Sequence, residues 1–234
     1  MTSNRCCHCT EGEHQVQISC LSLVPIFNHL SPEELWEISQ ALKAESYQRG
    51  EMIYRAGDPS QRLYIVHKGR VKIYRLATSG KEQLIRVLEP GDFTGELALF
   101  SESTHDAFAE ALEPTELCTM DREVLQEFLL QFPTISLRIL EEFSERLAKS
   151  ERQTTSLATE SVDRRIADYL LELSEDSGSL TVTLPVSRKD LASYLGTSPE
   201  TISRRLAEFE DSGWISQREQ RRIQILDPDA LRWW

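Results

Sequence analysis

Four of the five cysteines lie in one polar stretch near the start of the chain, RCCHCTEGEHQVQISC, residues 5–20. Cys6 and Cys9 have the C-x2-C spacing with which one loop chelates zinc or an iron–sulfur cluster. Cys20 follows after a gap of ten residues, which a polar loop closes at little entropic cost. Three further side chains of the stretch could bind a metal: Cys7, His8 and His14. The thiols could hold a cluster or zinc, form a disulfide, or belong to a disordered arm and hold nothing.

The composition decides which compartment these thiols meet. With 234 residues, 40% hydrophobic and 27% charged, the chain is long enough for two ordinary soluble domains. It has neither an apolar run long enough to span a membrane nor the apolar segment of a secretory signal. We therefore expect a cytoplasmic protein with no membrane partner, in which clustered cysteines bind a metal or act in redox chemistry.

Three kinds of element must position the thiols and any binding surface. Between Tyr47 and Phe100, short β-rich runs such as RLYIVHKG and RVKIYRL alternate with glycines, which predicts a sandwich, barrel or jelly roll. The glycines lie mostly 11–12 residues apart, at positions 50, 57, 69, 80, 91 and 95. Ser31 and Pro32 predict the start of a helix before the roll, and Asp121 predicts another after it.

A long helical pattern follows Pro133. Its heptad positions, spaced alternately by four and three, are Ser136, Leu140, Phe143, Leu147, Ser150, Thr154 and Leu157. Four apolar and three hydroxyl side chains make a weak coiled-coil seam between two copies. The same pattern also fits an amphipathic helix that packs on its own domain.

The stretch VSRKDLASYLGTSPETISRRLAEFEDSGWI, residues 186–215, predicts a helix-turn-helix. Ser187 caps the first helix and Gly196 ends it. Ser198 caps the second helix and Gly213 closes it. A hairpin pattern, WISQREQRRIQIL, follows as a wing.

Three residues at the start of the second helix could read DNA bases. Glu200, Ser203 and Arg204 share one face, where a recognition helix meets the major groove. Arg can bind guanine, Glu can accept from cytosine, and Ser can serve either role. A solvated polar face is the alternative, and the following wing favours DNA. The expected DNA contacts are Arg188, Ser198, Glu200, Thr201, Ser203, Arg204 and Arg205.

The net charge of −12 limits non-specific attraction to DNA. Residues 159–234 carry 10 Lys/Arg and 14 Asp/Glu, whereas residues 188–222 carry 7 and 6. Because phosphate neutralisation is weak, we expect useful binding to need a homodimer on a palindrome.

The roll with GDFTGELALF, the long helix and the winged helix with SPETISRRL resemble the CRP/FNR superfamily of transcription regulators over roughly residues 20–228. The resemblance implies an α+β fold in four parts. These are a cysteine-rich N-terminal arm (1–22), a β-roll or jelly-roll sensor domain of the cyclic-nucleotide-binding type (23–132), a dimerisation helix (133–160) and a winged helix-turn-helix DNA-binding domain (161–234).

The core E-T-I-S-R resembles the FNR branch, because the CRP branch usually carries Gly at the position of Ser203. The resemblance implies that Glu200, Ser203 and Arg204 read a TTGAT-type half-site, so that a homodimer binds a TTGAT-N4-ATCAA-like palindrome. Pro199 departs from the family pattern, and this departure concerns the outermost base of the half-site. RNA polymerase would be a further partner if the protein activates transcription.

Cyclic-nucleotide sensors of the family bind their anionic ligand with an Arg-Ser pair soon after the GEL motif. Asp106 and Ala107 stand at the matching positions here, and residues 87–121 contain nine Asp/Glu and no Lys or Arg. A buried anion without a cation is costly, so cAMP is not expected as a ligand. Gly95 and Glu96 are then interpreted as parts of the roll structure.

FNR-type regulators hold a [4Fe–4S] cluster with three N-terminal cysteines and one in the roll. Cys118 lies in AFAEALEPTELCTM, which resembles the stretch that carries this internal ligand. The implied ligands are Cys6, Cys9, Cys20 and Cys118, with Cys7 as a possible substitute. A disulfide between an N-terminal cysteine and Cys118, or zinc, would be the alternatives. Oxygen or nitric oxide would then loosen the arm and weaken helix pairing around Ser150 and Thr154.

An enzyme is not expected, because the sequence has no Ser/His/Asp set, P-loop or dinucleotide fingerprint. The five histidines are scattered at positions 8, 14, 29, 67 and 105. Their patterning indicates solvent or turn positions, although His8 and His14 could bind a metal.

Overall fold

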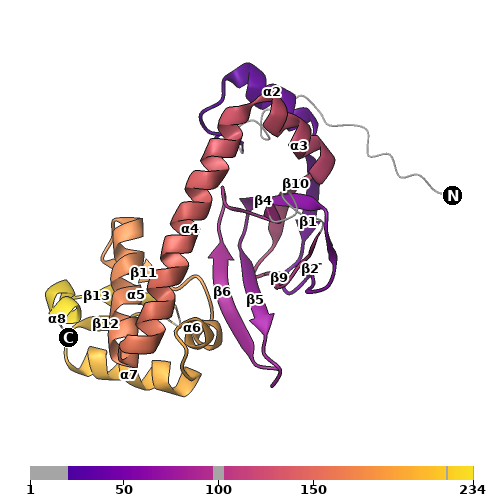
Figure 1. Ribbon diagram of the computed structural model, residues 1–234. Helices are drawn as coiled ribbons and strands as arrows, with labels where there is room; N and C mark the ends of the chain where they lie inside the picture. The colour runs from indigo at the N-terminus through magenta and orange to yellow at the C-terminus, as the bar shows by residue number, and fades with distance from the viewer. Residues whose placement is uncertain (1–20, 97–102, 220, 234) are drawn as a thin grey trace. The chain divides into compact units, whose positions relative to one another are not determined.

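The computed structural model describes residues 21–96, 103–219 and 221–233 (Figure 1). The chain folds into two compact units. The first lies within residues 1–72 and 88–145, and the second within residues 73–87 and 146–234. The division therefore falls inside the long helix, whereas the sequence placed a boundary near residue 160. No helix in the described ranges is long and apolar enough to cross a membrane.

Two four-stranded sheets build the predicted β-roll, with strand orders β1-β10-β4-β7 and β2-β9-β5-β6, and β3 and β8 form a separate antiparallel pair. The strands are β1 (Lys43–Tyr47), β2 (Met52–Tyr54), β3 (Pro59–Ser60), β4 (Arg62–Lys68), β5 (Val71–Leu76), β6 (Glu82–Leu88), β7 (Phe93–Thr94), β8 (Ser103–Thr104), β9 (Phe108–Ala111) and β10 (Thr115–Asp121). All six glycines that predicted turns have a positive φ, so they lie where other residues are strained. The glycine spacing therefore predicted the roll correctly.

Helices pack on one side of the β1-β10-β4-β7 sheet and close the core of the first unit. They are α2 (Pro32–Gln40), α3 (Arg122–Gln131) and the start of α4 (Pro133–Thr159). α2 begins at Ser31-Pro32, as predicted, and Ser31 and Glu34 form a capping box there. The core cluster includes Leu21, Ile65, Met120 and the thiol of Cys118.

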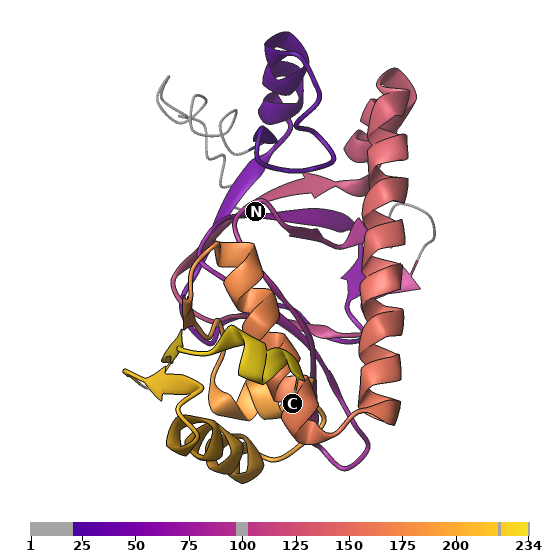
Figure 2. The same ribbon diagram turned by 90° about the vertical axis from the view of Figure 1, so that its left-hand side faces the viewer.

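α4 is one continuous helix of 27 residues (Figures 1 and 2). Ile135 and Ile139 face the core, with 0% and 1% of their surface exposed. Of the predicted heptad positions, Leu140, Leu147 and Leu157 remain 57%, 61% and 37% exposed. The helix thus packs on its own domain through one face and leaves the heptad leucines uncovered.

The second unit contains the predicted winged helix-turn-helix. Its elements are α5 (Val162–Ser177), β11 (Thr181–Thr183), α6 (Arg188–Tyr194), α7 (Pro199–Asp211), β12 (Ile215–Gln217), β13 (Arg222–Ile225) and α8 (Pro228–Trp233), with sheet order β11-β13-β12. Ser187 and Ser198 cap α6 and α7 as predicted, each accepting a hydrogen bond from a backbone N–H of the first turn. Gly196, with φ +64°, makes the turn between the two helices.

The β5–β6 segment of the second unit contacts α6 through Ser193. The hydroxyl of Ser193 accepts a hydrogen bond from the N–H of Leu84 and donates one to the carbonyl of Glu82, both at 2.7 Å. Gln83 Nε2 donates to the Ser193 carbonyl at 2.7 Å. Ser193 is 8% exposed, so a small polar side chain inside a helix serves here as a buried connector.

Candidate nucleic-acid interface

The recognition helix α7 is held by its apolar face. The helical spacing of Ile202, Leu206 and Phe209 predicts one buried face, and the three side chains are 0%, 0% and 3% exposed. Glu200 and Arg204 lie on the exposed side, and Ser203 between them is half-buried. The structure therefore brings the three predicted base-reading side chains to one outward face.

The start of α7 is fixed by its own side chains. Ser198 Oγ accepts a hydrogen bond from the Thr201 N–H at 3.2 Å and lies 3.2 Å from the Thr201 hydroxyl. Hydrogen bonds from the backbone N–H of Glu200 and from the side chain of Ser198 lower the pKa of Glu200. Glu200 is then a carboxylate at neutral pH, which accepts from an amino group of a base.

The adjacent arginines of α7 differ in their surroundings. The Arg204 side chain is 62% exposed, and Glu208 lies 3.9 Å away. Arg205 forms ion pairs with Asp163 of α5 at 2.7 Å and with Glu208 at 2.5 Å. Arg204 is placed to reach a ligand, whereas Arg205 links α7 to α5. A DNA contact by Arg205 stays a prediction.

Arg188, at the first position of α6, reaches across to α7 and to the wing. Its Nη1 donates to Ser203 Oγ at 3.1 Å, and its Nη2 donates to Gln217 Oε1 at 2.7 Å. The sequence predicted Arg188 as a DNA contact but gave no signal for this bridge. Gln217 belongs to β12 and was not among the predicted site residues.

The wing, which follows the recognition helix in sequence, carries three arginines. Arg218 and Arg222 are exposed, and Arg221 is half-buried. Arg218 donates from Nε and Nη2 to Gln224 Oε1 at 3.3 and 3.0 Å. These side chains can approach backbone phosphates, which position a protein on DNA without specifying a sequence.

The internal thiol lies where the sequence placed it, on the central strand β10 of the first unit. Cys118 is 4% exposed and belongs to the same core cluster as Leu21, the residue that follows Cys20. The other predicted ligands (Cys6, Cys7, Cys9 and Cys20) lie outside the described residues. Within the ranges that the structure describes, no three His, Cys, Asp or Glu side chains come together as a metal site.

Two glutamates within residues 87–121, the range without Lys or Arg, form ion pairs with cations of the roll. Lys72, whose side chain is 9% exposed, forms an ion pair with Glu110 at 3.1 Å. Arg70 donates to both carboxylate oxygens of Glu113 at 3.0 Å.

Position 95 requires glycine, because a Cβ there would lie 2.1 Å from the Arg62 carbonyl oxygen. This agrees with a structural role for Gly95 in the roll.

One histidine lies in a connection between two strands, β8 and β9, but is buried rather than exposed to solvent. His105 is only 8% exposed, and its ring stacks on Tyr54 with 3.7 Å between centroids. Burial lowers the pKa of His105, so its ring is neutral near pH 7. Histidine patterning could not reveal this stack, because Tyr54 is distant in sequence.

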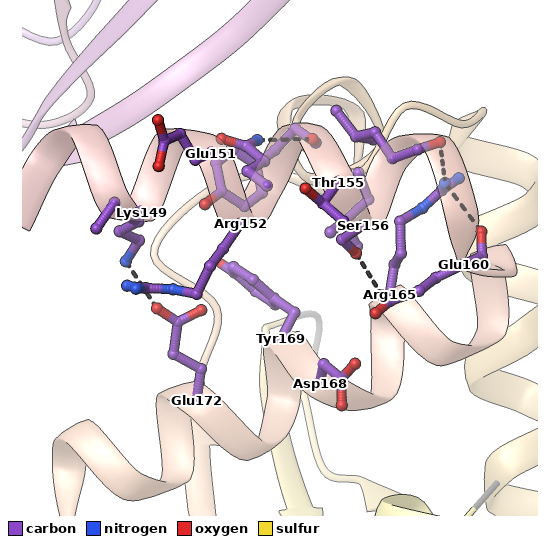
Figure 3. A pocket seen from close by; sticks show the side chains of 15 residues that line it. Lys149, Glu151, Arg152, Thr155, Ser156, Glu160, Arg165, Asp168, Tyr169 and Glu172 are labelled. Carbon is purple, nitrogen blue, oxygen red and sulfur yellow. Dashed lines mark hydrogen bonds and ion pairs between the residues drawn. The ribbon is translucent and has the colours of Figure 1, made fainter.

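A groove between α4 and α5 lies within the second unit (Figure 3). Lys149 donates to Glu172 at 2.7 Å, and Arg165 donates to the carbonyls of Leu157 and Glu160 at 3.1 and 3.2 Å (Figure 3). Glu151, Arg152 and Asp168 also line the groove, so it carries charges of both signs. The groove thus joins α4 to the DNA-binding domain and lacks the uniform positive charge of a phosphate site.

Two family descriptions match this chain, one in its N-terminal part and one in its C-terminal part. Residues 44–132 match the cyclic nucleotide-binding domain, and residues 164–233 match the Crp-like helix-turn-helix domain. The chain is 35% identical over 213 residues to the probable transcriptional regulator flp of Lacticaseibacillus casei, covering 91% of this chain and 96% of the relative.

Two further similarities extend over both units. The chain is 30% identical over 216 residues to the CRP-like cAMP-activated global transcriptional regulator of Mycobacterium tuberculosis, covering 90% of this chain and 96% of the relative. The structure of FixK2 from Bradyrhizobium japonicum matches with a TM-score of 0.74 and 27% identity, over 82% of this chain and 96% of FixK2.

Proposed function

Since the chain belongs to the CRP/FNR family of transcription regulators, which bind DNA, we propose that it acts as a homodimer on a TTGAT-N4-ATCAA-like palindrome. The observation that carries the proposal is the outward face of Glu200, Ser203 and Arg204 on a helix fixed by the Ser198 cap. A carboxylate, a hydroxyl and a guanidinium together offer the acceptors and donors that distinguish base pairs in the major groove.

The heptad face of α4 supports the homodimer. Leu140 and Leu147 are more than half exposed, although Ile135 and Ile139 of the same helix pack into the core. Pairing with α4 of a second copy would bury these leucines at the coiled-coil spacing. It would also bring two recognition helices to half-sites one helical turn apart.

A duplex carrying the palindrome tests this function. We expect the full chain to prefer it over a duplex with both half-sites scrambled by at least about 10³-fold at physiological salt. Fluorescence anisotropy across salt concentrations measures both affinities. Equal affinities would contradict sequence-specific binding to this palindrome.

The proposed signal is the redox state of the cysteines, with a [4Fe–4S] cluster on Cys6, Cys9, Cys20 and Cys118 favoured. Cys118 supports this because its thiol is buried in the cluster that contains Leu21, next in sequence to Cys20. An apolar shell of this kind would shield a cluster from solvent. When bound, the cluster would supply a link between arm and roll that oxygen or nitric oxide destroys.

Two other uses of the thiols give different chemical products. A disulfide between an N-terminal cysteine and Cys118 would release two electrons and two protons to an oxidant such as peroxide. Zinc would involve Cys and His ligands and no redox change at the metal. Iron and sulfide analysis of protein purified without oxygen separates the cluster from both. Colourless, iron-free protein would exclude the cluster.

We do not expect cAMP to be the effector, although one relative is named as cAMP-activated. Glu110 and Glu113 hold the cations Lys72 and Arg70, and Asp106 and Ala107 stand where cyclic-nucleotide sensors carry Arg and Ser. Calorimetric titration with cAMP should therefore show no binding. Micromolar binding would overturn this part of the proposal.

A further inference from the structure

The guanidinium of Arg188 lies between the recognition helix and the wing. Nη1 donates to Ser203 Oγ at 3.1 Å, and Nη2 donates to Gln217 Oε1 at 2.7 Å. Gln217 is itself fixed, because its N–H and its Nε2 donate to the two carboxylate oxygens of Glu210 at 2.6 and 2.9 Å. A series of hydrogen bonds thus runs from Glu210 at the end of α7, through Gln217 of the wing and Arg188, to Ser203.

This series of hydrogen bonds determines whether the Ser203 hydroxyl can donate or accept a hydrogen bond. An arginine has five N–H donors and no acceptor, so Ser203 Oγ must be the acceptor in its bond with Arg188. A hydroxyl that accepts from a cation turns its own hydrogen away from that cation. Within the described part of the chain, the structure records no acceptor for this hydrogen. The hydrogen is available to a ligand on the outward face of α7.

We infer that Arg188 is a positioning residue that makes Ser203 a hydrogen-bond donor to the base it reads. Acceptors in the major groove are N7 and O6 of guanine, N7 of adenine and O4 of thymine. Cytosine offers only its N4 amino donor there, whereas each of the other three bases offers an acceptor, so a serine held in this way discriminates against cytosine. The inference rests on the proposed DNA-binding function and assigns the chemical selectivity of one position within it.

A simple phosphate contact is the competing role for Arg188. Two internal bonds leave three of its five N–H donors, so both roles could coexist. They predict different results, however. A phosphate contact changes affinity for all sequences equally and contributes to the salt dependence. A positioning role changes the base preference at one position only.

The experiment begins with wild-type full chain and a random pool of duplexes, from which bound sequences are selected. Affinities for every single-base variant of the selected half-site are then measured for wild type, Ser203→Ala, Arg188→Met and Arg188→Lys. Ser203→Ala identifies the base pair that Ser203 reads. Absence of any selected sequence would count against the proposed function, whereas the inference is decided only by the preferences that follow.

We expect wild type to prefer a base that offers an acceptor over cytosine at the Ser203 position by roughly tenfold, the effect of one mismatched base pair. In Arg188→Met and Arg188→Lys this preference should fall below about twofold, with other positions unchanged. Only Arg188→Met should reduce the salt dependence of DNA binding, because Arg188→Lys keeps the positive charge. Unchanged preferences in Arg188→Met, or a full wild-type preference in Arg188→Lys, would overturn the inference.

Gln217→Met provides an independent variant outside both helices. It removes the acceptor that holds Nη2 and leaves Arg188 and Ser203 in place. The preference at the Ser203 position should weaken by at least threefold, a loss smaller than one full mismatch. Wild-type preference in this variant, with an unchanged melting temperature, would show that the bridge has no role in selectivity.

Discussion

Arg205 of α7 forms an ion pair with Asp163 of α5, with 2.7 Å between Nε and Oδ1. The neighbouring Arg204 points to the exposed side of the same helix. Two adjacent residues of identical charge therefore have different surroundings. Arg205 fixes the recognition helix on its domain, whereas the side chain of Arg204 is 62% exposed.

This difference predicts separate effects of Arg204→Met and Arg205→Met. Arg204→Met should weaken binding to the palindrome by about 1–3 kcal/mol and relax preference at one base pair. Arg205→Met should lower the melting temperature and weaken binding to all sequences alike, since it loosens α7. Anisotropy with single-base variants and thermal melting measure both. Identical base-preference profiles in the two variants would contradict the assignment.

The exposed heptad leucines predict a second outcome. Leu147→Glu should raise the dimer dissociation constant at least 100-fold, because a charge in an apolar seam loses several kcal/mol. Binding to the palindrome should fall with it. Leu130→Glu is the matched control, since Leu130 is 84% exposed and lies on α3. Sedimentation of both variants decides the point, and a dimeric Leu147→Glu would exclude α4 pairing.

Local chemistry explains why much of this fold was predictable. Ser31, Ser187 and Ser198 cap helices because their hydroxyls bind the first-turn amides, and this requires only neighbours in sequence. The apolar spacing of Ile202 and Leu206 predicted the buried face of α7 in the same way.

Contacts between distant segments were not predictable in this way. The bond from Arg188 to Ser203 spans 15 residues, and the bond from Leu84 to Ser193 spans 109. Both depend on how helices and strands meet, which no local pattern encodes. The burial of His105 on Tyr54 has the same origin. Sequence therefore predicted which face of α7 is buried and which is exposed, but not what orients its side chains.

Gly95 gives a third prediction, about the GEL motif. Its φ is +86°, and an added Cβ would lie 2.1 Å from the Arg62 carbonyl oxygen. Gly95→Ala should reduce the free energy of unfolding by at least ~3 kcal/mol, from the strained backbone and the clash. At Gly57, with φ +95°, no atom lies within 4 Å of the added Cβ, so Gly57→Ala should cost only about 1–2 kcal/mol. Denaturant unfolding compares the two, and equal costs would refute the packing argument.

His105 predicts a pH dependence of stability. Burial lowers its pKa below 6.5, against the opposing charges of Asp58, Asp106 and Glu96. The unfolded chain then binds more protons at this site than the folded chain, so stability falls as the pH drops through and below 6.5. His105→Phe keeps an aromatic ring on Tyr54 and should show a smaller loss of melting temperature between pH 7.5 and 5.5. Melting at pH 8, where the wild-type ring is neutral, is the reference, and parallel pH curves would contradict the prediction.

Cys118 gives the prediction that bears most directly on sensing. The thiol is 4% exposed in an apolar core, so Cys118→Ala should cost only about 1 kcal/mol and leave the fold intact. If Cys118 ties the arm to the roll, the variant should lose bound iron and bind DNA equally well with and without air. Cys7→Ala removes a thiol that the favoured ligand set does not need, and it should keep both iron and the response to air. Because the two substitutions are chemically identical, wild-type iron and air sensitivity in Cys118→Ala would exclude the internal thiol from the sensor, whatever the arm cysteines bind.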